Sequence, residues 1–341
     1  MPRHPTPLPD GLGELFRTDV ARVAGVAAGR LRARDLARPF HGVRTRGADP
    51  TPAPAGSEAP DEREDSPDQR AREAVIARVR AHALVLPPHA FYTGSTALAL
   101  WGMPLLDAAA APTAPLEVGS FAPHRPPRRP GILAVQVRPG LAHTTMFRVP
   151  LTGELVCVAT PATAWAMLAR THSEHDLVRL GDALVRIPRD DRGRRRPELQ
   201  LVTPAQLQAA ADAGRRQGVE RMRRALPQLR EHSMSILETD WRLTHLAAGL
   251  PEPTLDHEVR DAQHTLLGIS DAAFVAARVA VEIDGDHHRT SKRQWGRDIQ
   301  KQAAYAASGW EMVRLTSQHI RVRPALGIQM VRAALERRGF L

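Results

Sequence analysis

The hydrophobic pattern of the chain is most regular after Ser235, where helix-like and strand-like spacings follow one another. An amphipathic segment opens at Glu238 and ends at Gly249, which is typical of a helix that a glycine terminates. Three strand-like runs, a second helical run and a last strand follow, near residues 255–260, 269–276, 279–284, 292–308 and 310–315. This order predicts an α/β domain in which a mixed sheet has helices against its faces.

Weaker periodicity divides the rest of the chain. Residues 15–46 predict a small helix-turn-helix with a strand or wing behind it, because Thr18 can cap a first short helix and Gly25 can make the turn. The next stretch is rich in Pro, Ala, Asp and Glu without periodicity, which predicts a linker or disordered insertion. We therefore expect a winged helix, this linker, a central α+β domain and the C-terminal α/β domain, over residues 1–46, 47–67, 68–230 and 231–341.

The central region alternates between helical and strand-like runs. We expect helices at 68–85, 161–170, 174–186 and 204–230, and strands at 131–137 and 155–158. The run Gly94-Ser95-Thr96 precedes a short apolar segment, and we interpret it as the cap of a core helix. A phosphate-binding loop is not expected there, because its Gly-Lys-Ser/Thr ending is missing.

Basic side chains are expected to face outward on the second helix of the N-terminal segment. The pattern turns Leu31 inward and Arg30, Arg32 and Arg34 outward, and it places Arg44 on the wing. A recognition helix in the major groove needs such residues for base and phosphate contacts. These four arginines are candidate DNA-binding residues; the alternative is a small helical cap with a solvated basic face.

Carboxylates interrupt the two central apolar strands of the C-terminal pattern. Asp271 begins the second strand, and Glu282 and Asp284 lie two residues apart on the third, so that both point to one face. Burying a carboxylate is costly unless it is paired or binds a metal, and Mg²⁺ prefers carboxylate oxygens. His288 follows on the exit loop, where a histidine can act as a general acid or base. The alternative is a set of exposed acids that only form salt bridges with neighbouring arginines.

The overall charge favours a polyanionic partner. The formal net charge is +10, but lysine occurs only twice, and a composition rich in Arg, Ala and Pro is typical of a GC-rich genome. Charge alone therefore supports nucleic-acid binding weakly.

Cys157 is the only cysteine, which excludes a disulfide framework and a cysteine-ligated zinc site. No apolar run approaches the roughly 20 residues of a membrane span, and the N-terminus lacks an apolar signal core, so we expect a cytoplasmic protein without a membrane partner.

The C-terminal residues carry a resemblance to a known family. Its features are the helix-opening Glu238, the strand Asp271, the run Glu282-x-Asp284-Gly285-x-x-His288, the pair Asp298-x-x-Lys301, and the closing Gly309-Trp310 and Val313-Arg314-Leu315. Over roughly residues 233–325 this segment resembles the Vsr-like domains of the PD-(D/E)XK nuclease superfamily. The resemblance implies a restriction-endonuclease-like α/β fold and hydrolysis of DNA phosphodiester bonds with Mg²⁺ or Mn²⁺. It implies that Asp271 and Glu282 bind the metal, and that the catalytic residues are Glu238, Asp271, Glu282, Asp284 and His288.

One position departs from that family's pattern. A standard member has a lysine two residues after the strand glutamate, where this chain has Asp284. Vsr-like relatives resemble enzymes that use histidine instead, so His288, or the neighbouring His287, is the candidate replacement. The only lysines are Lys292 and Lys301. Because Lys301 lies one helical turn from Asp298, we expect it to form a structural ion pair.

The N-terminal half resembles a second family more loosely. The residues concerned are Val23-Ala24-Gly25-Val26, Leu31, the run from Leu36 to Arg44, and Thr93-Gly94-Ser95-Thr96-Ala97 before Leu100-Trp101-Gly102. Over about residues 12–185 the chain resembles the winged-helix antitoxins of abortive-infection, type IV toxin–antitoxin systems. This resemblance implies DNA binding, transcriptional autoregulation and a cognate toxin protein as partner. It transfers no catalytic residue.

Two functions follow from these observations. The first is a DNA-binding protein with a metal-dependent endonuclease domain; the second is a non-catalytic, antitoxin-like transcriptional regulator that retains a nuclease fold. The acidic residues and His288 favour the enzyme. The missing motif lysine favours the regulator.

Overall fold

The chain has a mixed α/β fold, as expected, with three sheets in the part of the chain described. The computed structural model describes residues 6–46, 67–149, 153–285 and 292–341, and of 292–298 the backbone alone. The expected linker lies outside these residues except for Pro67, and so does His288. None of the described helices combines the length and the apolar character that crossing a bilayer requires.

The chain divides into two compact units. The N-terminal unit comprises Met1–His172 with Gln206–Met222, and the C-terminal unit comprises Ser173–Ala205 with Arg223–Leu341. This division differs from the boundary expected at residue 231, because the segment from Ser173 to Ala205 belongs with the C-terminal sheet.

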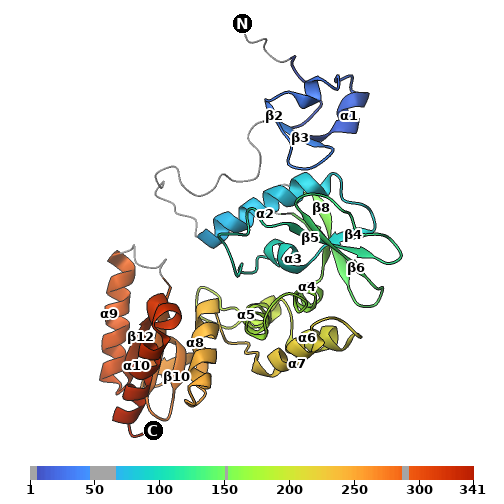
Figure 1. The fold of residues 1–341 in the computed structure, drawn as a ribbon. Helices are drawn as coiled ribbons and strands as arrows, with labels where there is room; N and C mark the ends of the chain where they lie inside the picture. The colour runs from blue at the N-terminus through green and yellow to red at the C-terminus, as the bar shows by residue number, and fades with distance from the viewer. Residues whose placement is uncertain (1–5, 47–66, 150–152, 286–291) are drawn as a thin grey trace. The chain divides into compact units, whose positions relative to one another are not determined.

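The N-terminal unit begins with a small sheet around a short helix (Figure 1). The elements are β1 (Leu15–Arg17), α1 (Thr18–Val23), the 3₁₀ turn η1 (Arg30–Arg32), β2 (Leu36–Ala37) and β3 (Val43–Arg46), and the strands pair in the order β1-β3-β2. The expected first helix and the turn at Gly25 (φ +84°) are present. The expected second helix is a single 3₁₀ turn instead. It stops because Ala33 is already extended and Leu36 pairs with Arg46 on β3.

The same unit contains a second, five-stranded sheet. Its strands pair in the order β6-β5-β4-β8-β7 and are β4 (Ala90–Tyr92), β5 (Leu116–Phe121), β6 (Ile132–Val137), β7 (Thr144–Arg148) and β8 (Leu155–Ala159). The helices are α2 (Pro67–Ala83), α3 (Gly94–Leu100), α4 (Pro161–Leu168), α6 (Pro204–Asp212) and α7 (Val219–Ala225), the last of which the unit boundary crosses. The strands expected at 131–137 and 155–158 are confirmed.

The helix expected over 204–230 is interrupted between α6 and α7. Gly214 (φ +148°) and Gly218 (φ +85°) take backbone conformations that other residues rarely adopt. At Gly218 a Cβ would also lie 2.0 Å from the carbonyl oxygen of Ala169. These two glycines therefore break the helix that the amphipathic pattern predicts.

The C-terminal unit has the element order predicted from the sequence (Figure 1). Three elements precede the predicted pattern: α5 (Glu174–Val185) and the 3₁₀ turns η2 (Pro197–Leu199) and η3 (Leu226–Gln228). The predicted pattern corresponds to α8 (Ile236–Ala247), β9 (Thr254–Arg260), β10 (Leu266–Phe274), β11 (Val279–Asp284), α9 (Lys292–Ala307) and β12 (Glu311–Thr316). The π-helical η5 (Gln318–Val322) and α10 (Pro324–Arg337) follow it and were not predicted. The sheet order is β12-β11-β10-β9, with β11 and β12 parallel and the other pairs antiparallel.

The two faces of this sheet pack against different helices. On one face, α8 and α10 complete a core that includes Trp241, Val281 and Val331. On the other face, α9 completes a core that includes Ala273, Ala280 and Tyr305. Side chains alternate along a strand, so Asp271 and Glu282, two positions from Ala273 and Ala280, belong to the face that α9 covers.

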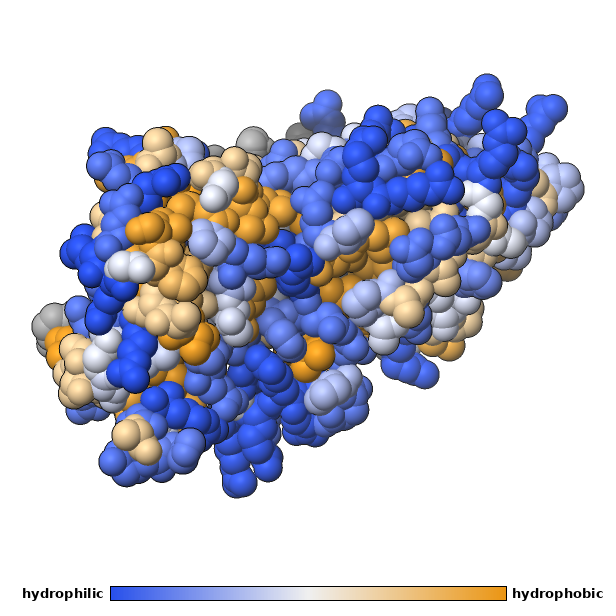
Figure 2. Space-filling view, turned by 90° about the horizontal axis from the view of Figure 1, so that it is seen from below, coloured by the Kyte–Doolittle hydropathy of each residue, from blue (hydrophilic) through white to orange (hydrophobic). Residues whose placement is uncertain are grey.

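Large apolar side chains at the surface are scattered. Figure 2 shows mostly hydrophilic residues with apolar patches between them. On α1, Val23 is 91% exposed. Scattered exposed apolar residues are normal in globular proteins, so they point to no particular partner.

Candidate active site

Asp271 and Glu282 occupy facing positions on neighbouring strands. The antiparallel register pairs Ala272 with Val281, and the next positions in that register are Asp271 and Glu282. Residues directly opposite each other in such a pair have Cβ atoms roughly 4.5–5.5 Å apart on one face. The Oδ2 atom of Asp271 accepts the N–H of Ile283 at 2.6 Å. The two acids that the sequence predicts to converge therefore do so, at the end of the β10–β11 ladder.

Lys301 of α9 lies against this pair. Its Nζ donates to Oε2 of Glu282 at 2.7 Å and to the carbonyl oxygen of Ile269 at 2.7 Å. Gly268 gives it room, because a Cβ there would lie 2.9 Å from Cε of Lys301. The described ion pair of Lys301 is with Glu282 on β11. The pair expected with Asp298 stays a prediction, because the side chain of Asp298 lies outside the described ones. A lysine is present beside the strand glutamate, although not from the position that the motif specifies.

Glu238 takes part in the start of α8. Its N–H donates to Oγ of the N-cap Ser235 at 3.1 Å, and its Oε2 accepts the N–H of Met234 at 2.7 Å. The Ser235 side chain thus caps the helix, while Glu238 accepts from the residue before the N-cap and not from the N-cap itself, as it would in a capping box. The side chain is 6% exposed, so this predicted catalytic residue also has a structural role.

Burial and mutual repulsion raise the pKa values of two of these acids. Burial, with the charge of Asp271 as the second cause, raises the pKa of Glu238 to about 8. Burial and the charge of Glu282 raise the pKa of Asp271 to about 7, against the opposing effects of the Ile283 amide and Lys301. Excess negative charge in a partly enclosed site favours either protons or an additional cation.

Asp284 lies close enough to Asp271 to raise its pKa further. It is half-buried at the end of β11, two residues from Glu282, which puts both on one face as predicted. His288 falls in the segment outside the described residues, so its predicted place beside these acids stays a prediction.

The arrangement fits a divalent cation in part. Oε1 of Glu282 is buried and has no hydrogen-bond partner among the described atoms, and the raised pKa of Asp271 marks uncompensated negative charge beside it. In the described part of the chain, however, no group of three or more His, Cys, Asp or Glu side chains is suitably placed to hold a metal ion. An ion held by Asp271 and Glu282 would need water for most of its coordination, as Mg²⁺ commonly does.

The four predicted DNA-binding arginines differ in their surroundings. Arg30 forms two hydrogen bonds with Asp35, at 2.8 and 2.7 Å. Arg44 donates to the carbonyl oxygens of neighbouring backbone, including that of Leu31 at 2.7 Å. Arg32 and Arg34 are exposed, and neither side chain has a partner among the described residues. Only these two retain guanidinium groups that fold contacts leave unused.

An acid on β9 binds the Arg-rich loop at 189–196, and sequence reasoning did not identify it. Asp256 is 3% exposed, with Nε of Arg189 at 2.8 Å and Nε of Arg195 at 3.0 Å. Its charge also contributes to the raised pKa of Glu238. No local sequence signal joins the loop to β9. For Lys301, the one sequence feature that indicated a role in the site was the rarity of lysine in this chain.

No family model, no curated protein and no solved structure matches this chain. The strongest functional indication in the chain is the geometry of Asp271, Glu282 and Lys301.

Proposed function

We propose that the C-terminal unit is a metal-dependent endonuclease domain of the restriction-endonuclease-like class that hydrolyses DNA phosphodiester bonds. The observation that supports this most is the facing pair Asp271 and Glu282, with Lys301 2.7 Å from the glutamate. Two acids and a lysine on the two central strands and the helix over them form a site suited to phosphate chemistry, although Asp271 lies inside β10 and not at its start as expected. The exposed Arg32 and Arg34 are the proposed DNA contacts of the N-terminal unit.

Asp271 and Glu282 would hold Mg²⁺ or Mn²⁺. When bound, such an ion polarises the phosphate and makes water a better nucleophile. The ammonium group of Lys301 fixes the orientation of Glu282, and its third N–H would donate a hydrogen bond to a phosphate oxygen. Glu238 holds a proton near neutral pH, since its pKa is about 8, and His288 remains the proposed general acid or base.

One observation favours the regulator. Lys301 already supplies a positive charge to Glu282, so the site could be neutralised without a metal. In that case the ion pair is a permanent part of the fold, and the chain acts through contacts with DNA and with a cognate toxin protein.

Incubation with DNA separates the two functions. Full-length protein in excess is mixed with supercoiled, linear, mismatched and single-stranded DNA, with Mg²⁺, with Mn²⁺ or with a chelator. The enzyme should cleave at least one substrate only when a metal is present. Absence of cleavage of all four over a range of pH would contradict the nuclease and leave the regulator.

Stabilisation by Mg²⁺ is expected to grow as the pH rises. The raised pKa values of Asp271 (about 7) and Glu238 (about 8) mean that the folded protein holds protons that the unfolded chain releases near pH 4. Without metal the fold therefore loses stability as the pH rises through this window. A cation competes with these protons, so the increase in Tm caused by Mg²⁺ should be larger at about pH 8.5 than at about pH 5.5.

Thermal unfolding with and without Mg²⁺ at both pH values measures this effect. The double variant Asp271→Asn/Glu282→Gln should show no metal-induced rise in Tm at either pH. A rise equal to that of the wild type would show that the metal binds elsewhere.

Replacing Arg32 and Arg34 with glutamine is expected to weaken DNA binding and its salt dependence. Each phosphate contact contributes about 0.9 to the slope of log K against log salt for duplex DNA, so losing two contacts should reduce the slope by about 2. Binding measured over a salt series tests this. The matched control is Arg125→Gln/Arg128→Gln, which removes the same charge from another exposed segment. Equal slopes for the two variants would mean that Arg32 and Arg34 are only a solvated basic face.

Replacing His288 with alanine is expected to slow DNA cleavage by about 10²–10⁴-fold, the usual contribution of general acid–base catalysis. Binding of DNA should stay close to that of the wild type, because the metal-binding acids are intact. Single-turnover cleavage and a binding titration on the same preparation give both quantities. An unchanged rate would leave Lys301 as the remaining candidate for the proton-handling group.

A further inference from the structure

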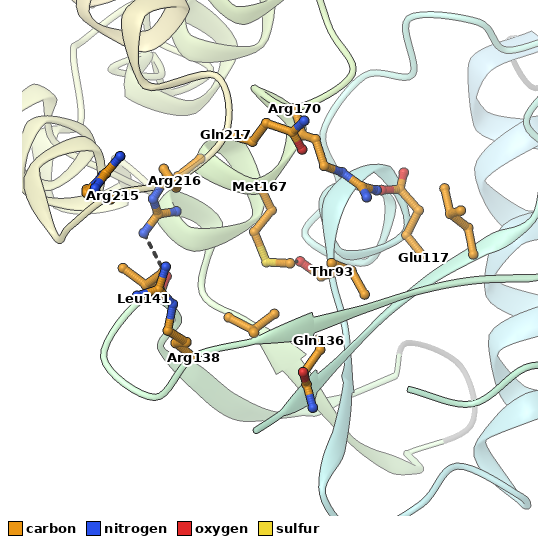
Figure 3. A pocket seen from close by; sticks show the side chains of 14 residues that line it. Thr93, Glu117, Gln136, Arg138, Leu141, Met167, Arg170, Arg215, Arg216 and Gln217 are labelled. Carbon is orange, nitrogen blue, oxygen red and sulfur yellow. Dashed lines mark hydrogen bonds between the residues drawn. The ribbon is translucent and has the colours of Figure 1, made fainter. Parts of the chain in front are cut away.

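A second candidate site lies in the N-terminal unit. A cavity of about 270 Å³ is bordered by β6, by α4 and by the segment between α6 and α7 (Figure 3). The elements that form it are separate from the sheet that holds Asp271 and Glu282. Its volume is near the lower end of the range of small-molecule sites, about 300–1,000 Å³.

Positive charge dominates the lining of this cavity. Arg138, Arg170, Arg215 and Arg216 all border it, and Glu117 is the one acid beside them. Figure 3 shows Arg138 and Arg216 on one side of the cavity and Arg170 on the other. Within the described residues, none of the four arginines forms an ion pair with a carboxylate. The cavity therefore has a surplus of positive charge.

Glu117 offsets only one of these four positive charges, and it is held in place by the backbone. Its Oε1 accepts the N–H of Ser95 at 3.0 Å. The carboxylate also packs against Gly94, where a Cβ would lie 2.1 Å from Oε2. Its position is fixed by the start of α3.

Arg216 has a guanidinium N–H that lacks a hydrogen-bond partner among the described residues. Its Nη2 donates to the carbonyl oxygen of Leu141 at 2.8 Å, whereas its Nε is buried without a partner in the described structure. Burial alone lowers the pKa of this guanidinium. Arg216 is half-buried, and desolvating a charge is costly unless it is paired. An anion in the cavity would reduce this cost.

Apart from Thr93, Gln136 and Gln217, the rest of the lining is apolar. Val135 and Val137 of β6, Ala166 and Met167 of α4, and Leu141 contribute hydrophobic surface. An inorganic ion alone would leave this surface uncovered. A ligand with an anionic group and an organic part matches both kinds of lining.

We infer that this cavity binds a phosphate monoester of about nucleotide size, with Arg216 and Arg170 on the phosphate and the apolar wall against the organic part. The planar guanidinium fork matches phosphate oxygens with two parallel hydrogen bonds. The phosphate can belong to a free nucleoside monophosphate or to the phosphorylated end of a short oligonucleotide.

Calorimetric titration of the full-length chain tests this inference. The ligands are adenosine monophosphate, adenosine, inorganic phosphate, and a dinucleotide with and without a 5′-phosphate. The monophosphate should bind more tightly than adenosine and than inorganic phosphate. Tighter binding of the phosphorylated dinucleotide than of the monophosphate would assign the site to a nucleic-acid end, and the reverse order to a free nucleotide.

Two variants locate the binding. Arg216→Met and Arg170→Gln should each raise Kd by at least about tenfold, since a hydrogen bond to a charged group is worth roughly 1.5–3 kcal/mol and 1.4 kcal/mol is tenfold. Arg170 makes no side-chain hydrogen bond in the described structure. Its variant should therefore fold, and its Kd can be measured even if Arg216→Met does not fold. The control Arg125→Met removes an exposed arginine outside the cavity and should leave Kd unchanged. Absence of saturable binding, or equal affinity in all three variants, would overturn the inference.

Discussion

Replacing Asp271 with asparagine is expected to reduce metal-dependent DNA cleavage by about 10³-fold. A metal ion that polarises phosphate contributes several kcal/mol to transition-state stabilisation, and each 1.36 kcal/mol is a factor of ten in rate. Asparagine keeps an oxygen that can accept the N–H of Ile283, which Asp271 accepts at 2.6 Å. It removes only the charge and one carboxylate oxygen, so the change isolates the metal-binding role.

The stability of the same variant separates lost chemistry from lost folding. Burial and the charge of Glu282 raise the pKa of Asp271 to about 7, so the ionised side chain is a destabilising feature of the metal-free protein above that pH. The asparagine variant should therefore unfold at a Tm no lower than that of the wild type without metal. The control is Glu336→Gln, a change from carboxylate to amide at an exposed position of α10. Cleavage by Asp271→Asn at the wild-type rate would contradict the proposed site.

Lys301 shows what the sequence could predict about the site and what it could not. Alternating apolar residues in β10 and β11 set which face each acid occupies, so the proximity of Asp271 and Glu282 followed from local spacing. The contact between Lys301 and Glu282 joins α9 to β11, across a separation of 19 residues. It depends on how the helix lies across the sheet and on the space at Gly268, and neither has a local sequence signal.

The helices and strands from α8 to β12 were predicted well for a similar reason. Each one buries a continuous apolar face, so the period of the pattern reveals its type. In the N-terminal segment the pattern is shorter, and the expected second helix is only the turn Arg30–Arg32. The hydrogen bonds of Arg30 to Asp35 and of Arg44 to Leu31 likewise follow from the tertiary fold. A count of basic residues cannot distinguish such arginines from those free to bind DNA.

A buried ion pair joins two helices of the C-terminal unit that lie far apart in the sequence. Asp182 of α5 and Arg242 of α8 are 1% and 0% exposed, and Nη2 of the arginine lies 2.8 Å from Oδ2 of the aspartate. Oγ1 of Thr239 donates to the same oxygen at 2.9 Å, and the N–H of Arg230 donates to Oδ1 at 2.8 Å. These contacts tie α5 to α8 within the C-terminal unit. A domain cut at residue 231 would leave Arg242 buried without its partner.

Replacing Arg242 with methionine is accordingly expected to destabilise the C-terminal unit by about 3–5 kcal/mol, the usual cost of removing one member of a buried ion pair. Asp182 would then be buried with only neutral donors, and its pKa, which burial already raises, would rise further. A carboxyl group with a raised pKa stabilises the fold at low pH and loses that contribution as the pH rises. The loss of stability should therefore be larger at about pH 8 than at about pH 5 in urea unfolding.

Adding Asp182→Asn removes the carboxylate that is left without its ion-pair partner, and it should restore more than half of the lost free energy of unfolding. The control Arg192→Met, at an exposed position, should lose almost none. A loss that is independent of pH and that Asp182→Asn does not relieve would mean that Arg242 acts through packing alone.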